Sequence, residues 1–142
     1  MLIHAYTVRM NDTDAAGQIY FADQFRIAHE TFEAYMASIG HHFGRFLLEY
    51  PYMIPIVHAE ADYRQPVFVG DALRIELSVG HIGTSSFSPA YRILRESDDT
   101  EVGFVKVVHV CIDKGTEKIT PVPETMRTIL NSLGNLSECI VS

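Results

Sequence analysis

NDTDAAGQIYFADQFRIAHETFEAYMASIG, residues 11–40, holds the clearest periodic pattern in the sequence. From residue 21 onward, apolar side chains recur every three or four residues, which is the period of a helix with one apolar face. Glycine at position 40 is typical of the residue that follows a helix C-terminus. The segment therefore predicts a long helix that begins around residues 19–22. Its apolar positions are Phe21, Phe25, Ala28, Phe32, Tyr35 with Met36, and Ile39.

Five shorter segments have the patterns of strands. The first, residues 3–9, precedes the helix, and the other four follow it. In residues 71–80 apolar and polar side chains alternate, as in a strand with one buried face, whereas residues 101–113 are apolar on both faces, as in a central strand. We expect hairpin-length connections between the four later strands, which span residues 54–66, 71–80, 86–96 and 101–113.

Two short helices complete the pattern. One occupies residues 43–49, and the other closes the chain at residues 121–134, with proline at its start and Gly134 at its end. A strand, a long one-faced helix and four further strands predict an α+β fold, in which an antiparallel sheet of about five strands packs against the helix. An open sheet has two unpaired edges, so we expect the chain to form homo-oligomers.

The composition indicates one globular domain that spans residues 1–142. The chain has 47% apolar and 20% charged residues, no apolar run near the ~20 residues of a membrane span, and a formal charge of −7 with scattered basic residues. We expect neither a membrane nor a nucleic-acid partner, because clustered lysine and arginine bind phosphate backbones. The N-terminus lacks the features of an export signal, and Cys111 and Cys139 form no disulfide framework, so we expect a cytoplasmic protein with ordinary thiols.

Two aspartates one residue apart precede the long helix, and they admit two interpretations. Asp14 is followed by a small Ala-Ala-Gly turn, and the helix N-terminus beyond it offers unpaired N–H groups that stabilise an oxyanion. A carboxylate facing such donors suits acyl-transfer chemistry, and Gly17 lets a ligand approach the backbone closely. Asp12 and Asp14 also fit a structural turn, which aspartate often forms, and the pattern alone favours the turn.

Several common catalytic motifs are missing from the sequence. It has no Gly-x-Ser-x-Gly elbow, no His-Glu-x-x-His motif and no glycine-rich nucleotide loop, which argues against serine-triad, zinc-hydrolase and nucleotide-binding functions. His109 and Cys111 fall on one face of a predicted strand, where a buried packing pair is favoured over a metal site. His29 and His58 each fit a core histidine as well as a functional one.

Residues 12–21, DTDAAGQIYF, resemble the D-x-D-x-A-G-x-x-[FYW]-[FY] signature of hotdog-fold acyl-CoA thioesterases of the 4-hydroxybenzoyl-CoA thioesterase type. The resemblance extends along most of the chain, because Pro66, Gly70-Asp71 and the 83–85 turn also match that family. Three further segments look closest to the 1,4-dihydroxy-2-naphthoyl-CoA hydrolases of phylloquinone and menaquinone biosynthesis: His29-Glu30, Val57-His58-Ala59 and His109-Val110-Cys111-Ile112. The resemblance implies a hotdog fold, in which the sheet wraps around one long helix.

The resemblance also implies roles for individual residues. Asp14 falls at the catalytic carboxylate, which acts as a nucleophile on the thioester carbonyl or as a general base for water. The backbone N–H of Phe21 falls at the oxyanion donor. Gly17 makes room for the thioester, and Asp12 is a turn or capping residue.

The sites of this family lie between subunits, so the implied site combines residues from two chains. His58 is the expected polar contact to an aromatic acyl group, and Gly83 and Thr84 are expected to line the substrate from another chain. The family prototype has a basic cluster at this turn that is absent here, so we assign no residues to the CoA phosphates. No metal and no cofactor are implied, because CoA is part of the substrate.

The implied function is hydrolysis of an aromatic acyl-CoA, with 1,4-dihydroxy-2-naphthoyl-CoA as the leading candidate, by a homotetramer built from dimers. One alternative is a thioesterase for 4-hydroxybenzoyl-CoA or a short-chain acyl-CoA. Another is a noncatalytic hotdog module that binds an acyl-CoA. Asp14 together with Gly17 argues against the module, because binding alone does not need a carboxylate aimed at a carbonyl.

Overall fold

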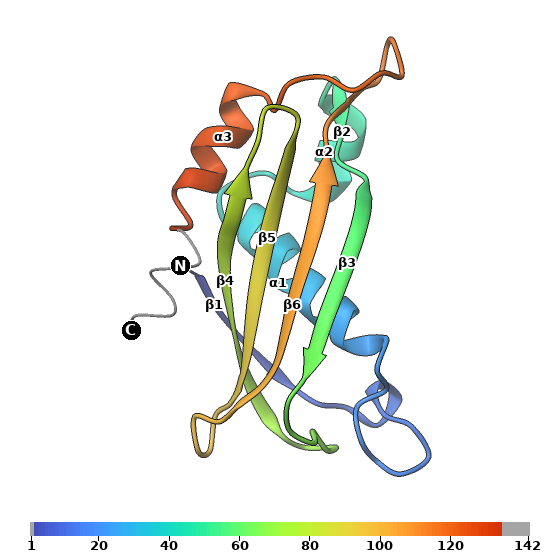
Figure 1. The fold of residues 1–142 in the computed structure, drawn as a ribbon, viewed down its shortest axis with the longest axis vertical. Helices are drawn as coiled ribbons and strands as arrows, with labels where there is room; N and C mark the ends of the chain where they lie inside the picture. The colour runs from blue at the N-terminus through green and yellow to red at the C-terminus, as the bar shows by residue number, and fades with distance from the viewer. Residues whose placement is uncertain (1, 135–142) are drawn as a thin grey trace.

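A five-stranded antiparallel sheet with a long helix across it forms the centre of the structure, a computed structural model that describes residues 2–134. Figure 1 shows the long helix α1 running diagonally behind the strands, with α2 and α3 at one end of the sheet. The prediction of an α+β fold is confirmed. The described elements are β1 (Leu2–Thr7), the 3-10 turn η1 (Met10–Asp12), α1 (Asp23–Ser38), α2 (Phe43–Glu49), β2 (Tyr52–Met53), β3 (Ile56–Tyr63), β4 (Ala72–Ile82), β5 (Ser86–Arg95), β6 (Glu101–Val110), β7 (Ile112–Asp113) and α3 (Glu124–Asn131).

The strands of the main sheet are ordered β1-β4-β5-β6-β3, so β1 and β3 form its two edges. β4, β5 and β6 follow one another as hairpins, as predicted. The expectation of a hairpin between β3 and β4 is wrong, because β3 pairs with β6 and residues 64–71 carry the chain back to β4. The spacing of strands along a sequence does not encode such a pairing, since packing between distant segments decides it.

One face of α1 is buried against the sheet. Phe21 and Ile39, which the spacing places on that face, are exposed because α1 begins at Asp23 and ends at Ser38. The buried stripe is therefore rotated slightly from the predicted one and gains Ile27. Its fully buried apolar side chains are Ile27, Ala28, Phe32 and Met36.

The C-terminus of α1 is closed as the sequence predicts. Gly40 has a φ of +87°, a conformation that glycine adopts without steric strain. The N–H of His41 donates to the carbonyl of Met36 at 2.7 Å, and the N–H of Gly40 donates to that of Ala37 at 3.1 Å. These two bonds form a Schellman motif and turn the chain toward α2.

The predicted strand at residues 101–113 is divided in two. β6 ends at Val110, and β7 pairs with β2 in a separate two-stranded sheet. Side chains along β6 alternate between buried and half-buried rather than being buried on both faces. Although β6 is an interior strand between β5 and β3, its outward face is only partly covered within this chain.

The two short helices lie where they are predicted. α2 occupies residues 43–49, and α3 lies within residues 121–134, with Pro123 at its N-cap and Gly134 at a φ of +75° shortly after its end. One hydrophobic cluster includes buried residues from Val8 to Leu133. Cys139 and the end of the predicted 1–142 domain lie outside the described residues.

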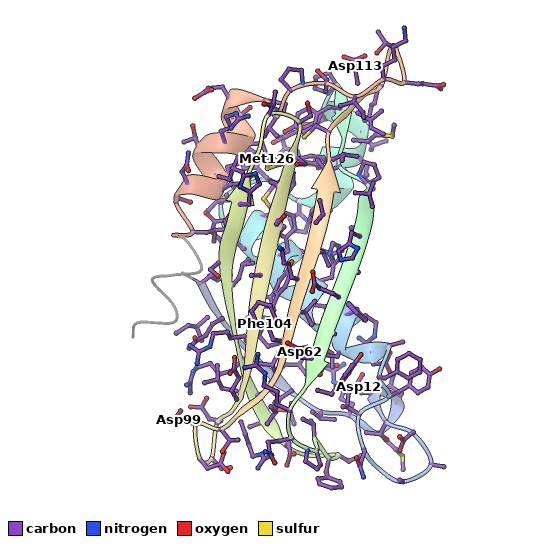
Figure 2. The ribbon with its side chains drawn as sticks, in the orientation of Figure 1. Asp12, Asp62, Asp99, Phe104, Asp113 and Met126 are labelled. Carbon is purple, nitrogen blue, oxygen red and sulfur yellow. The ribbon has the colours of Figure 1, made fainter. Side chains whose placement is uncertain are left out.

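A buried glutamine ties the first turn of α1 to the sheet. The Nε2 of Gln24 donates to the carbonyl of Asp62 at 3.0 Å, and at 3.4 Å to that of Phe104. Figure 2 labels Asp62 on β3 and Phe104 on β6, side by side in the sheet. The amide of Gln24 lies over Gly103, where a Cβ atom would come within 2.7 Å of Oε1. Gly103 is therefore needed for this close approach.

We predict that Gly103→Ala lowers the free energy of unfolding by about 1–3 kcal/mol, because the added methyl group displaces the buried Gln24 amide. Urea denaturation followed by circular dichroism measures the change. Gly44→Ala is the matched control, because a Cβ at Gly44 meets no atom within 4 Å and alanine favours the α2 helix. Equal midpoints for Gly103→Ala and the unsubstituted protein would contradict the role of Gly103.

Candidate active site

Asp12 is the buried anchor of the loop that leads into α1. Its side chain is only 1% exposed, and its carboxylate accepts hydrogen bonds from the N–H of Arg9 and the hydroxyl of Tyr6, each at 2.8 Å. The Arg26 guanidinium, on α1, pairs with the same carboxylate. Burial alone would raise the pKa of Asp12, but these partners outweigh it and hold the pKa below its usual value. Asp12 therefore joins β1, η1 and α1, which agrees with its implied structural role.

Asp14 has the opposite environment, because its side chain is exposed at the tip of the loop. Its Oδ1 accepts hydrogen bonds from the N–H of Ala16 at 2.9 Å and of Gln18 at 3.3 Å. Gly17 has a φ of +77° and its carbonyl accepts a bond from Val69, which holds the loop against the segment before β4. Asp14 thus organises a turn, as the structural interpretation expects. No donor among the described residues contacts Oδ2, so this oxygen is available for chemistry.

Phe21 lies immediately before the N-cap of α1. Its side chain is 62% exposed, and its carbonyl accepts a 2.5 Å hydrogen bond from the Tyr63 hydroxyl at the end of β3. Within residues 2–134 its N–H donates to no backbone carbonyl. This amide therefore remains available beside the positive end of the α1 dipole, where it suits a developing oxyanion.

A hollow of about 280 Å³ adjoins this loop and the end of β3. It lies between the segment after Gly17, the first turn of α1 and the chain that follows Tyr63. The side chains or backbone of Gln18, Ile19, Gln24, Tyr63, Gln65 and Pro66 contribute to its walls.

The structure places His58 on the sheet face opposite α1. His58 pairs in register with Val108, while Ala59 pairs with the buried Val107, so His58 projects from the sheet face opposite α1. Its side chain is 58% exposed and lies 3.3 Å from Glu60 on the same face. The interpretation of His58 as a core histidine is wrong, and its role as an acyl contact stays a prediction.

Gly83 and Thr84 form the turn between β4 and β5. The Arg127 guanidinium of α3 donates to both of their carbonyls, at 2.6 and 3.1 Å. This turn lies at the far end of β4 from Asp14, and eleven residues of strand span about 33 Å. Figure 1 shows the two regions at opposite ends of the molecule. One chain therefore does not bring Gly83 and Thr84 together with Asp14.

His109 and Cys111 are both buried, as the sequence favours. Burial raises the pKa of the Cys111 thiol to about 11, so the thiol stays protonated and unreactive at neutral pH. Among residues 2–134, no group of three or more histidine, cysteine, aspartate or glutamate side chains is arranged to hold a metal ion.

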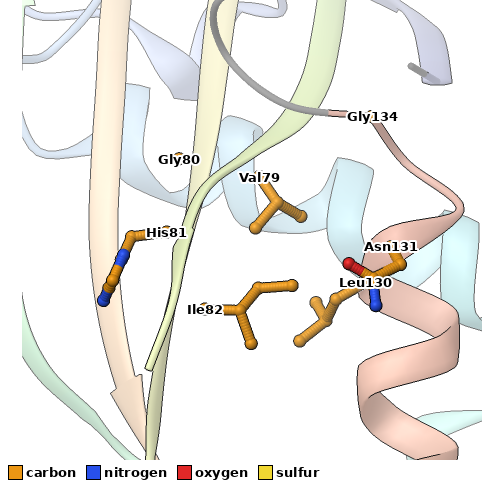
Figure 3. A pocket seen from close by; sticks show the side chains of 7 residues that line it. All are labelled: Val79, Gly80, His81, Ile82, Leu130, Asn131 and Gly134. Atoms are coloured by element: carbon orange, nitrogen blue, oxygen red, sulfur yellow. The ribbon is translucent and has the colours of Figure 1, made fainter. Parts of the chain in front are cut away.

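Two further hollows were not foreseen from the sequence. One, of about 360 Å³, lies between the end of β4 and α3. Figure 3 shows Ile82 and Leu130 facing each other across it. The other, of about 450 Å³, lies between α1, α2 and the start of β3 and includes His29 and His109. The pattern of the sequence could not reveal this second hollow, because its walls come from α1, α2, β2, β3 and β6, and β6 is far from the others along the chain.

The chain belongs to the thioesterase-like superfamily, whose family model matches residues 8–130. A 1,4-dihydroxy-2-naphthoyl-CoA hydrolase from Synechococcus elongatus is 37% identical over 121 residues, which cover 84% of this chain and 88% of the relative. A hydrolase of the same name from Rippkaea orientalis is 35% identical over 130 residues, which cover 91% of this chain and 94% of the relative.

A solved structure shows the same fold. The crystal structure of a 1,4-dihydroxy-2-naphthoyl-CoA thioesterase from Synechocystis superposes with a TM-score of 0.85 at 26% identity, covering 92% of this chain and 96% of the other. The hotdog fold is therefore confirmed. No helix within the described part of the chain has the length and apolar character needed to cross a membrane.

We predict that acid removes the stabilising contribution of Asp12. Because its pKa in the folded protein lies below the unfolded value, the contribution is present above about pH 4 and falls as the pH drops toward the folded pKa. Asp12→Asn should be less stable than the unsubstituted protein at pH 7, and the difference should shrink below pH 4. Urea denaturation at a series of pH values measures it, with Glu117→Gln at an exposed turn as the control. A difference that does not depend on pH would contradict the ionised role of Asp12.

Proposed function

We propose that the protein hydrolyses 1,4-dihydroxy-2-naphthoyl-CoA to 1,4-dihydroxy-2-naphthoic acid and CoA, in phylloquinone or menaquinone biosynthesis. The main support is that Asp14 and Phe21 lie on one loop at the start of α1, and within residues 2–134 neither the Asp14 Oδ2 nor the Phe21 N–H has a hydrogen-bond partner. Relatives that bear the name of this activity match more than four-fifths of the chain. We also propose that the enzyme is cytoplasmic and needs neither a metal nor a cofactor.

The proposed reaction uses the two groups in complementary ways. The Asp14 carboxylate either attacks the thioester carbonyl carbon or removes a proton from an attacking water. In both cases the carbonyl oxygen gains negative charge, which the Phe21 N–H and the α1 dipole stabilise. The carbon–sulfur bond then breaks, and CoA leaves as a thiolate that takes up a proton. In the attack route, water then hydrolyses the acyl–Asp14 anhydride and releases the acid.

We predict that Asp14→Asn lowers kcat/KM for 1,4-dihydroxy-2-naphthoyl-CoA about a hundredfold or more, because an amide neither attacks the carbonyl nor removes a proton from water. Thiol release across a panel with 4-hydroxybenzoyl-CoA, benzoyl-CoA and short-chain acyl-CoAs measures activity and preference. Asp99→Asn, in a distant hairpin, is the matched control.

Each outcome of this panel has a separate meaning. Full activity of Asp14→Asn would refute the catalytic role of Asp14. A strong preference for 4-hydroxybenzoyl or short-chain thioesters would replace the proposed substrate and leave the thioesterase activity in place. If the unsubstituted protein binds acyl-CoAs but hydrolyses none, the noncatalytic alternative is correct.

We further propose that the site is completed by a second copy of the chain, paired along β3. This edge strand leaves its backbone edge without a partner in the described chain, and Ile56, Val57 and Tyr63 are about half exposed or more. An exposed apolar edge is typically covered by another strand. In an antiparallel pair with two-fold symmetry, the Tyr63 end of one β3 lies beside the Ile56 end of the other. Residues from opposite ends of two chains then meet, and two such dimers would form the expected tetramer.

We predict that Val57→Lys weakens dimerisation about tenfold or more, because it would place a lysine charge within the paired edge of each copy, and such charges oppose edge-to-edge association. Val57 is 59% exposed in the single chain, so its fold should persist. Sedimentation velocity over a range of concentrations measures the association, and thiol release should fall in parallel. Val69→Lys, at an exposed position before β4, is the control. A stable monomer that retains full activity would refute the shared site.

A further inference from the structure

The hollow of about 450 Å³ between α1, α2 and the start of β3 has the size and lining of a ligand site. Its walls are mostly apolar, with Phe43 and Leu47 from α2, Pro55 just before β3 and Ile56 at its start. Two imidazole rings and one carboxylate interrupt this apolar lining: His29, Glu33 and His109. A hollow of this kind suits a flat apolar group that carries a small number of polar atoms.

His109, which lines this hollow, carries a buried acceptor that has no partner within residues 2–134. The side chain is 1% exposed, and its Nδ1 lies 2.8 Å from the carbonyl of Ile54, to which it donates because a carbonyl can only accept. Burial and the neighbouring His29 ring lower the pKa of His109 to about 4, so the ring is neutral at pH 7. Its Nε2 then carries a lone pair, and this buried atom has no hydrogen-bond partner within residues 2–134.

The His109 ring is fixed in this orientation by its neighbours. It stacks on Phe87 with ring centroids 4.9 Å apart and an interplanar angle of 3°, and Phe32 lies against it at 5.7 Å. Two rings and one hydrogen bond leave little freedom for the imidazole to turn. Leaving a buried acceptor unpaired costs about 1–3 kcal/mol, so the position of Nε2 favours a ligand that donates a hydrogen bond.

His29 supplies a second polar atom nearby. Its ring centroid lies 6.5 Å from that of His109, its Nε2 is 3.4 Å from the Glu33 carboxylate, and its buried Nδ1 has no partner among the described residues. His29 and Glu33 follow Phe25 by one and two turns on the same stripe of α1. The hollow therefore lies along the helix whose N-terminus carries the predicted oxyanion donor.

We propose that this hollow binds the aromatic acyl group of the substrate and that His109, through Nε2, accepts a hydrogen bond from a phenolic hydroxyl on its ring. The inference rests on the proposed thioesterase function and names the residues that select a hydroxylated ring. His29 is the second polar contact in the same hollow. A ring without a hydroxyl, or an aliphatic chain, would leave the buried Nε2 unpaired and bind less well.

The proposed dimer connects this hollow to the reacting groups. The hollow opens at the Ile56 end of β3, whereas the Phe21 carbonyl is bound by Tyr63 at the other end. Antiparallel pairing of two β3 strands brings these ends together. A ring seated in the hollow of one copy then directs its thioester carbonyl toward the Asp14 loop and Phe21 amide of the second copy.

The test uses two CoA thioether ketones that cannot be hydrolysed, one with a 4-hydroxy-2-naphthyl ring and one with a 2-naphthyl ring. Titration calorimetry measures the dissociation constant of each analogue. We expect the unsubstituted protein to bind the hydroxylated analogue about tenfold more tightly, the net value of one good hydrogen bond. Equal affinities, or no binding of either analogue, would overturn the proposal.

Two substitutions of His109 separate its two nitrogens. The amide of His109→Asn can keep the donor to Ile54 but does not reach the position of Nε2, so the preference for the hydroxylated analogue should disappear. The longer His109→Gln can place an amide oxygen near that position and should keep part of the preference. His4→Asn, on the opposite edge strand β1, is the control and should bind as the unsubstituted protein does. An unchanged preference in His109→Asn would overturn the role of Nε2.

The binding test and the activity test can refute the two proposals independently of each other. If the protein binds the hydroxylated analogue preferentially but hydrolyses no acyl-CoA, the acyl site stands and the proposed thioesterase function fails. If it hydrolyses 1,4-dihydroxy-2-naphthoyl-CoA but binds both analogues equally, the function stands and the role of His109 fails.

Discussion

Burial of one face of α1 against the sheet is the interaction on which the rest of the structure depends. Ile27, Phe32 and Met36 are fully buried there, and removing a side chain of this size from water contributes about 1.5–3 kcal/mol. The same contact fixes where the helix begins relative to β3 and β6, because Gln24 in its first turn donates to the carbonyl of Asp62. The positions of the Asp14 loop and of the histidine-lined hollow follow from the position of this helix.

Two neighbouring aspartates illustrate how burial separates residues of one type. Asp12 is buried. Its carboxylate accepts hydrogen bonds from the Tyr6 hydroxyl and the Arg9 N–H and pairs with the Arg26 guanidinium. Asp14 lies two residues further on in solvent, with one oxygen engaged by the turn and the other free. The first holds the loop to β1 and α1, which leaves the second in a defined position to meet a substrate. The structural interpretation and the catalytic one are therefore compatible in this loop.

The regions that the proposed shared site combines lie apart within one chain. The Asp14 loop lies at one end of the long sheet, and the 83–84 turn and the hollow beside Ile56 lie at the other. The edge strand β3 connects two of these regions and is exposed along most of its length. A two-fold pairing along that edge would join the regions without any change in the fold of each chain.

The sequence by itself determined the local elements and the loop that we propose carries the chemistry. Helical spacing predicts α1, glycine at position 40 predicts its end, and the DTDAAG segment indicates Asp14, because these signals depend on residues close together in the chain. Only the tertiary structure decided that β3 pairs with β6, that His58 faces away from α1, and that His29 and His109 share one hollow. Each of these depends on contacts between segments far apart in sequence, and spacing along the chain does not record which surfaces pack together.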